Sequence, residues 1–193
     1  MIYLPTTLEL ELNVTDEQFW TLCHKHTDLR FERSAKGDLI IMPPTGGLTS
    51  HRNSDITFQL ELWSRKTKLG KVFDSSGGFK LPNGANRFPD AAWIKIERWN
   101  NLTPEEKEKF LPLCPDFVVE LRSPNDSLQQ IQMKMAEYRA NGARLGWLID
   151  PKRKVVEVYR PGIDVEVLQN PTTVSGEDVL PGFQLDLTEI WGG

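Results

Sequence analysis

Two acidic residues, Asp90 and Glu120, stand inside segments that otherwise favour buried strands. Asp90 lies within the strand-forming run 87–94, and Glu120 is the charged residue of the apolar run 117–121. Burying an unpaired carboxylate costs several kcal/mol, so each of the two must have a partner. If the two strands are neighbours, both carboxylates can face one point, which is the oxygen-ligand arrangement that Mg²⁺ or Mn²⁺ favours. The spacing leaves one alternative open, in which each carboxylate meets an arginine or a backbone N–H.

The segments that carry these carboxylates alternate between strand and helix signals. Short strand-like pieces, separated by glycine, proline and serine turns, occupy residues 71–94. The strand 117–121 is followed by a helical stretch near 126–140, with apolar residues at steps of three and four, and then by the strand-like run 145–149. Strand, helix and strand in this order normally form neighbouring parallel strands joined by a right-handed crossover.

A crossover of this kind predicts which residues share a core and where the helix packs. Phe117, Val119 and Trp147 should belong to one core, and the helix that carries Met135 should lie beside that core. This placement would also bring the helix close to Glu120, because the helix must fold back over the strand that it follows.

The N-terminal third is expected to form a helix, a hairpin and a second, longer helix. A capping-box pattern at residues 15–18 predicts the first helix. Alternation in 29–33 and the apolar run 39–42 predict the hairpin. Thr49 or Ser50 is expected to cap the long helix. This mixture indicates an α/β protein with a mixed sheet and helices against it, not a doubly wound parallel sheet.

The composition is that of a single globular domain spanning residues 1–193. Of the 193 residues, 39% are hydrophobic and 26% are charged, enough to bury a core. Residues 1–6 do not begin a signal peptide, and no apolar run approaches the ~20 residues of a membrane span, so we expect a cytoplasmic location and no membrane contact. Cys23 and Cys114 have no CxxC partner, which indicates reduced thiols. The formal charge of -4 excludes a generally basic protein that coats nucleic acids, although a local groove is compatible with it.

Several motifs occur in a fixed order along the chain. They are Phe88-Pro89-Asp90, the run 117–124 that contains Val118-Val119-Glu120 and ends in Ser123-Pro124, Lys134 four residues before Tyr138, and the run 142–151 that ends in Asp150-Pro151. In this order they resemble a family of putative restriction endonucleases, abundant in photosynthetic bacteria, that belongs to the PD-(D/E)XK nuclease superfamily. The resemblance extends from about Thr15 to Tyr159.

The resemblance implies a restriction-endonuclease-like fold, with a mixed central sheet flanked by helices, and hydrolysis of DNA. It implies that Asp90 and Glu120 are ligands of Mg²⁺ or Mn²⁺, and that a lysine orients or activates the attacking water. In the general superfamily pattern this lysine stands two residues after the glutamate, where this chain has Arg122. Arginine is a poor base, but it can hold a phosphate or stabilise developing negative charge, so Arg122 is expected to contact the substrate.

Lys134 is the candidate for the missing lysine, and the resembling family also places its lysine on this helix. A helix that begins near Asp126 carries Lys134 ~12 Å along its axis, whereas Glu120 lies ~7 Å back along its strand. A lysine arm of ~6 Å can close the remaining ~5 Å. Replacement of Lys134 by Met, which keeps the apolar stem, is expected to leave folding largely intact. In the alternative interpretation, Lys134 has no role in the site: its apolar stem packs at the edge of the apolar stripe and its ammonium reaches solvent.

Three further residues are weaker candidates for the site. Glu32 would lie on the solvated face of its strand, but the resemblance makes it an additional acidic member of the site. His51 is expected either to contact the substrate or to support the start of the long helix. Tyr138 follows Lys134 by four residues and should pack beside it on the same face of the helix.

Three functions compete at this point. The first is a metal-dependent endonuclease that acts on DNA, with basic residues along an open groove and a homodimer suited to cutting both strands of a duplex. The second is an inactive nuclease fold kept as a binding or regulatory module, which the acidic charge and Arg122 favour. The third is a hydrolase of small phosphate esters, which needs a closed pocket. The basic residues proposed for the groove are Arg52, Arg65, Lys66, Lys68 and Arg87.

Overall fold

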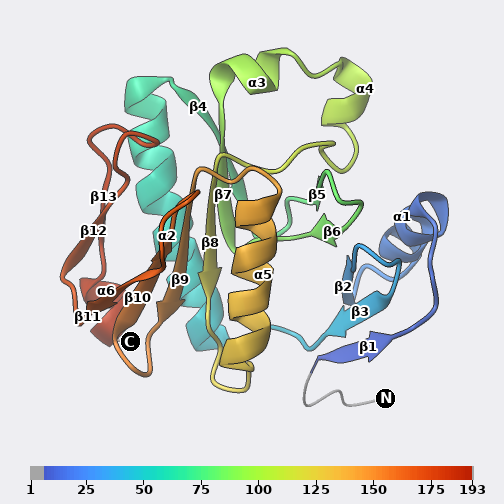
Figure 1. Ribbon diagram of the computed structural model, residues 1–193, viewed down its shortest axis with the longest axis horizontal. Helices are drawn as coiled ribbons and strands as arrows, with labels where there is room; N and C mark the ends of the chain where they lie inside the picture. The colour runs from blue at the N-terminus through green and yellow to red at the C-terminus, as the bar shows by residue number, and fades with distance from the viewer. Residues whose placement is uncertain (1–6, 193) are drawn as a thin grey trace.

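A six-stranded mixed sheet lies between two helices in the computed structural model of the chain, which describes residues 7–192 (Figure 1). Residues 1–6, which were inspected above for a leader, lie outside the described part. One pair of neighbouring strands, β8 and β9, is parallel, and the other neighbours in this sheet are antiparallel. The strand order is β11 (Glu166–Gln169), β10 (Val155–Tyr159), β9 (Leu145–Asp150), β8 (Phe117–Leu121), β7 (Ala91–Lys95) and β4 (Gly70–Asp74).

Two helices cover the opposite faces of this sheet. In Figure 1, α5 (Leu128–Ala140) lies on the near side of the sheet, beside β8, and α2 (Gly47–Thr67) lies behind the sheet. The buried residues Ile56 and Leu60 of α2 belong to the core on one face, and Met135 of α5 belongs to the core on the other. The predicted order of strand, helix and neighbouring parallel strand is confirmed.

The packing prediction is right for the strands and wrong for the helix. Phe117, Val119 and Trp147 share one core, as expected, but that core lies on the α2 face. Met135 packs with Val118 on the other face. The reason is that successive side chains of a strand point to opposite faces, so the residue type alone does not say which face a helix covers. The same alternation directs Glu120 to the α5 face, where it meets α5.

A second, five-stranded antiparallel sheet occupies the N-terminal part of the chain. The predicted hairpin is confirmed as two of its strands, and the capping box at Thr15 begins α1 (Asp16–Lys25). Phe19 of α1 packs with Phe31 and Leu39 of the hairpin. The sheet order is β1 (Leu8–Leu10), β3 (Leu39–Met42), β2 (Arg30–Arg33), β6 (Asn86–Arg87) and β5 (Phe79–Lys80).

The long helix α2 begins earlier than predicted. Its N-cap is Gly46, which makes no side-chain capping hydrogen bond, and neither Thr49 nor Ser50 caps it. Instead, the hydroxyl of Thr49 accepts a hydrogen bond of 3.2 Å from Ser123 Oγ in the loop after β8. The first turn of α2 is therefore attached to the end of the central strand.

The remaining elements close the two ends of the central sheet. The C-terminal hairpin of β12 (Thr173–Ser175) and β13 (Gln184–Asp186), followed by α6 (Thr188–Gly192), completes the core on the α2 side. Two short helices, α3 (Ile96–Asn100) and α4 (Pro104–Lys107), connect β7 to β8. Among residues 7–192, none of the helices combines the length and the apolar character needed to cross a membrane.

Candidate active site

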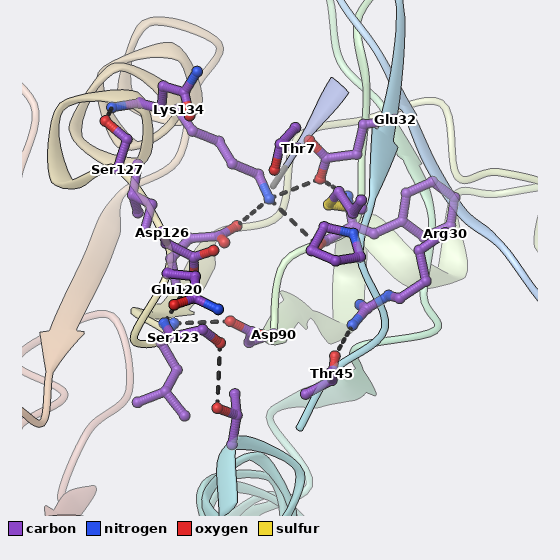
Figure 2. A pocket seen from close by; sticks show the side chains of 18 of the residues that line it. Thr7, Arg30, Glu32, Thr45, Asp90, Glu120, Ser123, Asp126, Ser127 and Lys134 are labelled. Carbon is purple, nitrogen blue, oxygen red and sulfur yellow. Dashed lines mark hydrogen bonds and ion pairs between the residues drawn. The ribbon is translucent and has the colours of Figure 1, made fainter. Parts of the chain in front are cut away.

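A cleft of about 800 Å³ lies where the two sheets meet. Its walls come from β2 and β3, the first turn of α2, the loop after β8 and the inner side of α5. Asp90, Glu120, Lys134 and Glu32 all line this cleft, although they come from four separate parts of the chain. Residues far apart in the sequence therefore form one polar cluster (Figure 2).

Asp90 is fixed by hydrogen bonds to both of its carboxylate oxygens. It stands directly before β7, and its Oδ2 accepts from the backbone N–H of Leu121 on neighbouring β8 at 2.8 Å. Its Oδ1 accepts from Asn53 Nδ2 of α2 at 2.7 Å. Burial raises the pKa of Asp90, and the Leu121 N–H, the charge of Lys134 and the Asn53 bond oppose that rise. The side chain is thus held in one orientation, with lone pairs left for another ligand.

Glu120 is buried, and one of its oxygens carries the contacts to α5. Its Oε1 accepts from Lys134 Nζ at 2.8 Å and from the hydroxyl of Tyr138 at 3.0 Å. Burial raises the pKa of Glu120 to about 7 against the opposing charge of Lys134, and the negative charges of Asp90 and Glu32 raise it further. The charge of Asp90, which precedes β7, therefore acts on the carboxylate of Glu120 on β8.

Lys134 joins the two sheets at the centre of the cleft. Its Nζ lies 2.7 Å from Glu32 Oε1 and 2.8 Å from Glu120 Oε1. Dashed lines mark these contacts of Lys134 in Figure 2. It also donates to the backbone oxygen of Phe88 at 3.5 Å. Burial would lower the pKa of Lys134, but the charges of Glu120 and Glu32 raise it above its ordinary value. The ammonium is therefore charged, and its arm crosses from α5 to the central strand.

Glu32 is buried on β2 rather than solvated, and it binds two cations. Its Oε2 lies 2.9 Å from Arg87 Nη1, and its Oε1 accepts from the backbone N–H of Phe88 as well as from Lys134. Burial would raise the pKa of Glu32, but the charges of Lys134 and Arg87 hold it below its ordinary value. Arg87 also binds Glu137 at 2.6 Å. Arg87, expected along the rim of a groove, is thus part of an internal ion-pair network.

Asp90 and Glu120 are the side chains of the cleft that could hold a divalent cation. Within residues 7–192, no group of three or more His, Cys, Asp or Glu side chains could hold a metal ion, so a site here would depend on these two carboxylates and on water. Mg²⁺ is usually bound by one or two carboxylates and keeps several waters, which fits this pair. Acidic residues also exceed basic ones in the lining, so a cation would offset repulsion. The acidic residues are Glu9, Glu32, Asp90, Glu120, Asp126 and Glu137, and the basic ones are Arg30, Arg87 and Lys134.

Two other predicted residues lie away from the cleft lining. His51 is exposed on α2 and does not line the cleft. Arg122 places its Nη1 2.7 Å from Oδ2 of the fully buried Asp150, and it donates to the backbone oxygen of Asp126. The ion pair of Arg122 with Asp150 and the hydrogen bond to Asp126 therefore hold the loop after β8. Contact of Arg122 or His51 with a substrate stays a prediction.

The basic residues predicted for a groove on α2 are spread along the helix. Arg65, Lys66 and Lys68 stand at its C-terminal end, ~25 Å from the first turn that lines the cleft, because the helix rises 1.5 Å per residue. Arg52 lies nearer but does not line the cleft either.

Two residues of the site were not predicted from the sequence. Asn53 lies in the buried stripe of α2 between Thr49 and Ile56, and a polar residue at that spacing is a signal that could have been used. Arg30 precedes Glu32 by two residues on β2, so both side chains leave the same face of the strand. Arg30 lines the cleft and donates to Thr45 Oγ1 at 2.7 Å.

Tyr138→Phe tests whether the hydroxyl on Glu120 is structural or chemical. Tyr138 is fully buried, and burial together with the charges of Glu120 and Glu32 raises its pKa well above the ordinary value, so it acts as a donor and not as a base. We expect a loss of about 1–2 kcal/mol in the free energy of unfolding, measured by urea denaturation, since one buried hydrogen bond is removed. Any metal-dependent activity should fall by less than about tenfold, the cost of one neutral hydrogen bond. A loss as large as that expected for Lys134 would assign the hydroxyl a role in the chemistry.

Known proteins resemble this chain in sequence and in fold. The family model Uma2, described as putative restriction endonuclease, matches residues 16–188. A solved structure, a putative nuclease belonging to DUF820 from Anabaena variabilis ATCC 29413, superposes with a TM-score of 0.77 at 21% sequence identity. The match covers 92% of this chain and 97% of that one, and at this identity it shows a shared nuclease-like fold. A comparison with curated proteins found no match.

Proposed function

Because the chain belongs to the Uma2 family of putative restriction endonucleases, we propose that it is an endonuclease that hydrolyses DNA phosphodiester bonds with Mg²⁺ or Mn²⁺. The observation that supports this most is the meeting of Asp90, Glu120 and Lys134 in one cleft. Two carboxylates beside one charged lysine can hold a cation and a phosphate together, which is what phosphodiester hydrolysis requires.

Each residue has a defined part in the proposed reaction. Asp90, oriented by Asn53 and by the Leu121 N–H, and Glu120 would hold the cation. When bound, the cation activates a water molecule and neutralises charge on the scissile phosphate. Lys134 is charged, so its part is to orient the water and to stabilise negative charge rather than to accept a proton. Glu32 keeps the ammonium in place from the opposite wall.

The first turn of α2 supports an anionic substrate. Residues 46–49 line the cleft, and the N-cap Gly46 makes no side-chain capping hydrogen bond. The first N–H groups of a helix have no partner within the helix, and they carry the positive end of its dipole. They therefore add to the positive potential on the side of the cleft that faces the loop after β8.

One observation favours the second candidate, an inactive nuclease fold that serves as a binding or regulatory module. Six acidic residues line the cleft against three basic ones, so the cleft alone repels a phosphate chain. The two candidates differ in the need for a metal ion, because a module has no use for one. A symmetrical homodimer belongs to the endonuclease proposal, since two sites related by a two-fold axis would cut both strands.

A direct cleavage assay separates these candidates. The purified chain is incubated with single-stranded, double-stranded and branched DNA in the presence of Mg²⁺, Mn²⁺ or EDTA. We expect cleavage with the metals, none with EDTA and none with Asp90→Ala, which loses the oriented carboxylate. Products on a denaturing gel give the measurement, and circular dichroism shows that the variant is folded. If the folded wild-type chain leaves all three DNA forms intact with both metals, the endonuclease proposal is wrong.

A further inference from the structure

Arg30 projects from β2 into the same cleft as the proposed metal ligands. It stands two residues before Glu32, so both side chains leave the same face of the strand. Glu32 forms an ion pair with Lys134, whereas Arg30 forms no ion pair with any described residue. We infer that Arg30 binds a phosphate group of the DNA strand beside the bond that is cut. The inference rests on the proposed function and adds a substrate contact that the motifs did not indicate.

The guanidinium of Arg30 is fixed by neutral partners. Its Nη1 donates to Thr45 Oγ1 at 2.7 Å and its Nη2 donates to the backbone oxygen of Ser75 at 3.1 Å. A guanidinium has five N–H groups, and these two bonds leave three that no described residue engages. The side chain is therefore held in place while its positive charge stays unneutralised.

The other two cations of the lining are already neutralised. Arg87 binds Glu32 and Glu137, and Lys134 binds Glu32 and Glu120. In the part of the chain that the structure describes, Arg30 is the lining cation with no carboxylate at ion-pair distance. Arg30 is therefore the lining cation whose charge is available to bind a phosphate that enters the cleft. The planar fork of arginine matches two phosphate oxygens at once.

The position of Arg30 fits a phosphate close to the proposed metal site. Thr45, its partner, directly precedes the N-cap of α2, so the guanidinium lies beside the positive end of that helix. Figure 2 shows Arg30 and Asp90 in one cleft. Arg30, the helix end and a cation on Asp90 would therefore surround one anion.

A purely structural role for Arg30 makes a different prediction. Its two bonds connect β2 to residues 45 and 75, and an arginine that served only this purpose would affect stability without affecting the salt dependence of DNA binding. Each phosphate neutralised by the protein adds ~0.7–0.9 to the slope of log K against log salt, depending on whether the DNA is single-stranded or duplex. The slope therefore distinguishes a phosphate contact from a structural one.

The test measures binding of fluorescein-labelled single-stranded and duplex oligonucleotides by fluorescence anisotropy across a salt series. The buffer contains Ca²⁺, and a denaturing gel confirms that the DNA stays intact. The variants are Arg30→Met and Arg30→Lys. The matched control is Arg144→Met, which removes the same charge from an exposed arginine. Arg144 directly precedes β9, and Glu120 lies toward the other end of the parallel pair of β8 and β9.

Arg30→Met should bind DNA about 10- to 100-fold more weakly, the loss expected for a hydrogen bond to a charged group. Its salt slope should fall by about one phosphate. Arg30→Lys, which keeps the charge but loses the fork, should keep the slope and lose about tenfold in affinity. Arg144→Met should stay within about twofold of the wild type, as surface changes do.

The outcomes separate this inference from the proposed function. If Arg30→Met keeps the affinity and the slope of the wild type, Arg30 does not bind phosphate, whatever the activity of the chain. If the predicted losses occur but no metal supports cleavage, the Arg30 contact stands and the endonuclease proposal falls. If the wild-type chain binds none of the oligonucleotides, both are overturned. Should Arg30→Met fail to fold cooperatively, Arg30→Gln, which removes the charge but keeps a polar end, replaces it, and wild-type affinity and slope in that variant contradict the inference.

Discussion

Lys134→Met is expected to reduce DNA hydrolysis by roughly two to four orders of magnitude, as the loss of a positioned electrostatic group does. The ammonium lies 2.8 Å from Glu120 and 2.7 Å from Glu32, at the centre of the cleft. Binding of Mn²⁺ should persist or become tighter, because a positive charge that competes for Glu120 is removed. Single-turnover cleavage rates and a Mn²⁺ titration measure the two effects separately.

The same variant should also lose stability, which corrects the expectation drawn from the sequence that folding would be largely intact. Removal of Lys134 leaves Glu32 and Glu120 as buried carboxylates that have lost their shared cation. Removing one partner of a buried ion pair costs about 3–5 kcal/mol. The double variant Glu32→Gln/Lys134→Met removes one of the two negative charges and should recover much of that loss, while hydrolysis stays low.

Two results would contradict the assignment of Lys134. If Lys134→Met keeps full activity while the folded Arg122→Ala variant is inactive, Arg122 has the role, even though its guanidinium binds Asp150. If the double variant regains activity together with stability, the lysine acts only by supporting the fold.

Glu120→Gln should abolish metal-dependent hydrolysis, with a loss of roughly three orders of magnitude or more, because the amide is a much weaker ligand for a hard cation. The amide keeps an oxygen that can accept from Lys134 and Tyr138, and Glu32 still neutralises Lys134, so the free energy of unfolding should change little. Cleavage rates at saturating Mn²⁺ and urea denaturation provide the measurements.

The chain offers a matched control for this substitution. Glu157 is also a buried carboxylate on a central strand, and it accepts hydrogen bonds from Gln132 and Tyr159, but it does not line the cleft. Glu157→Gln should leave cleavage within a few-fold of the wild type. Equal losses in the two variants would mean that the effect comes from disturbing the sheet and not from the cleft.

The sequence predicted those parts of the site that depend on local patterns. The apolar run around Glu120, the helix stripe around Lys134 and the next strand are each visible in a short window, and a short crossover makes their strands neighbours. The rise of helix and strand then placed Lys134 within reach of Glu120. What the pattern did not give was the face of the sheet that the helix covers, since alternation is compatible with either.

The contacts made by the N-terminal sheet could not be predicted in this way. Glu32 and Arg30 approach the central sheet only because β2 pairs with β6, which directly precedes the segment that carries Asp90. That pairing joins residues more than fifty positions apart and leaves no periodic signal. Glu32 therefore looked like a residue on a solvated face, and Arg87 like one on a basic rim. The partner of Arg122 is Asp150, at the end of the neighbouring strand β9, and the pattern does not say which charged residues of two neighbouring strands will pair.

Binding of Mn²⁺ to the purified chain, followed by electron paramagnetic resonance, tests the central claim most directly, because it needs neither DNA nor turnover. Asp90 and Glu120 face one cleft, and Asp90 is held there by Asn53 and Leu121. We expect the wild type to deplete the signal of free Mn²⁺, Asp90→Asn and Glu120→Gln each to lose this binding, and Glu157→Gln to keep it. Equal binding by the wild type and by folded Asp90→Asn and Glu120→Gln, or no binding by the wild type, would contradict a metal site on these two carboxylates.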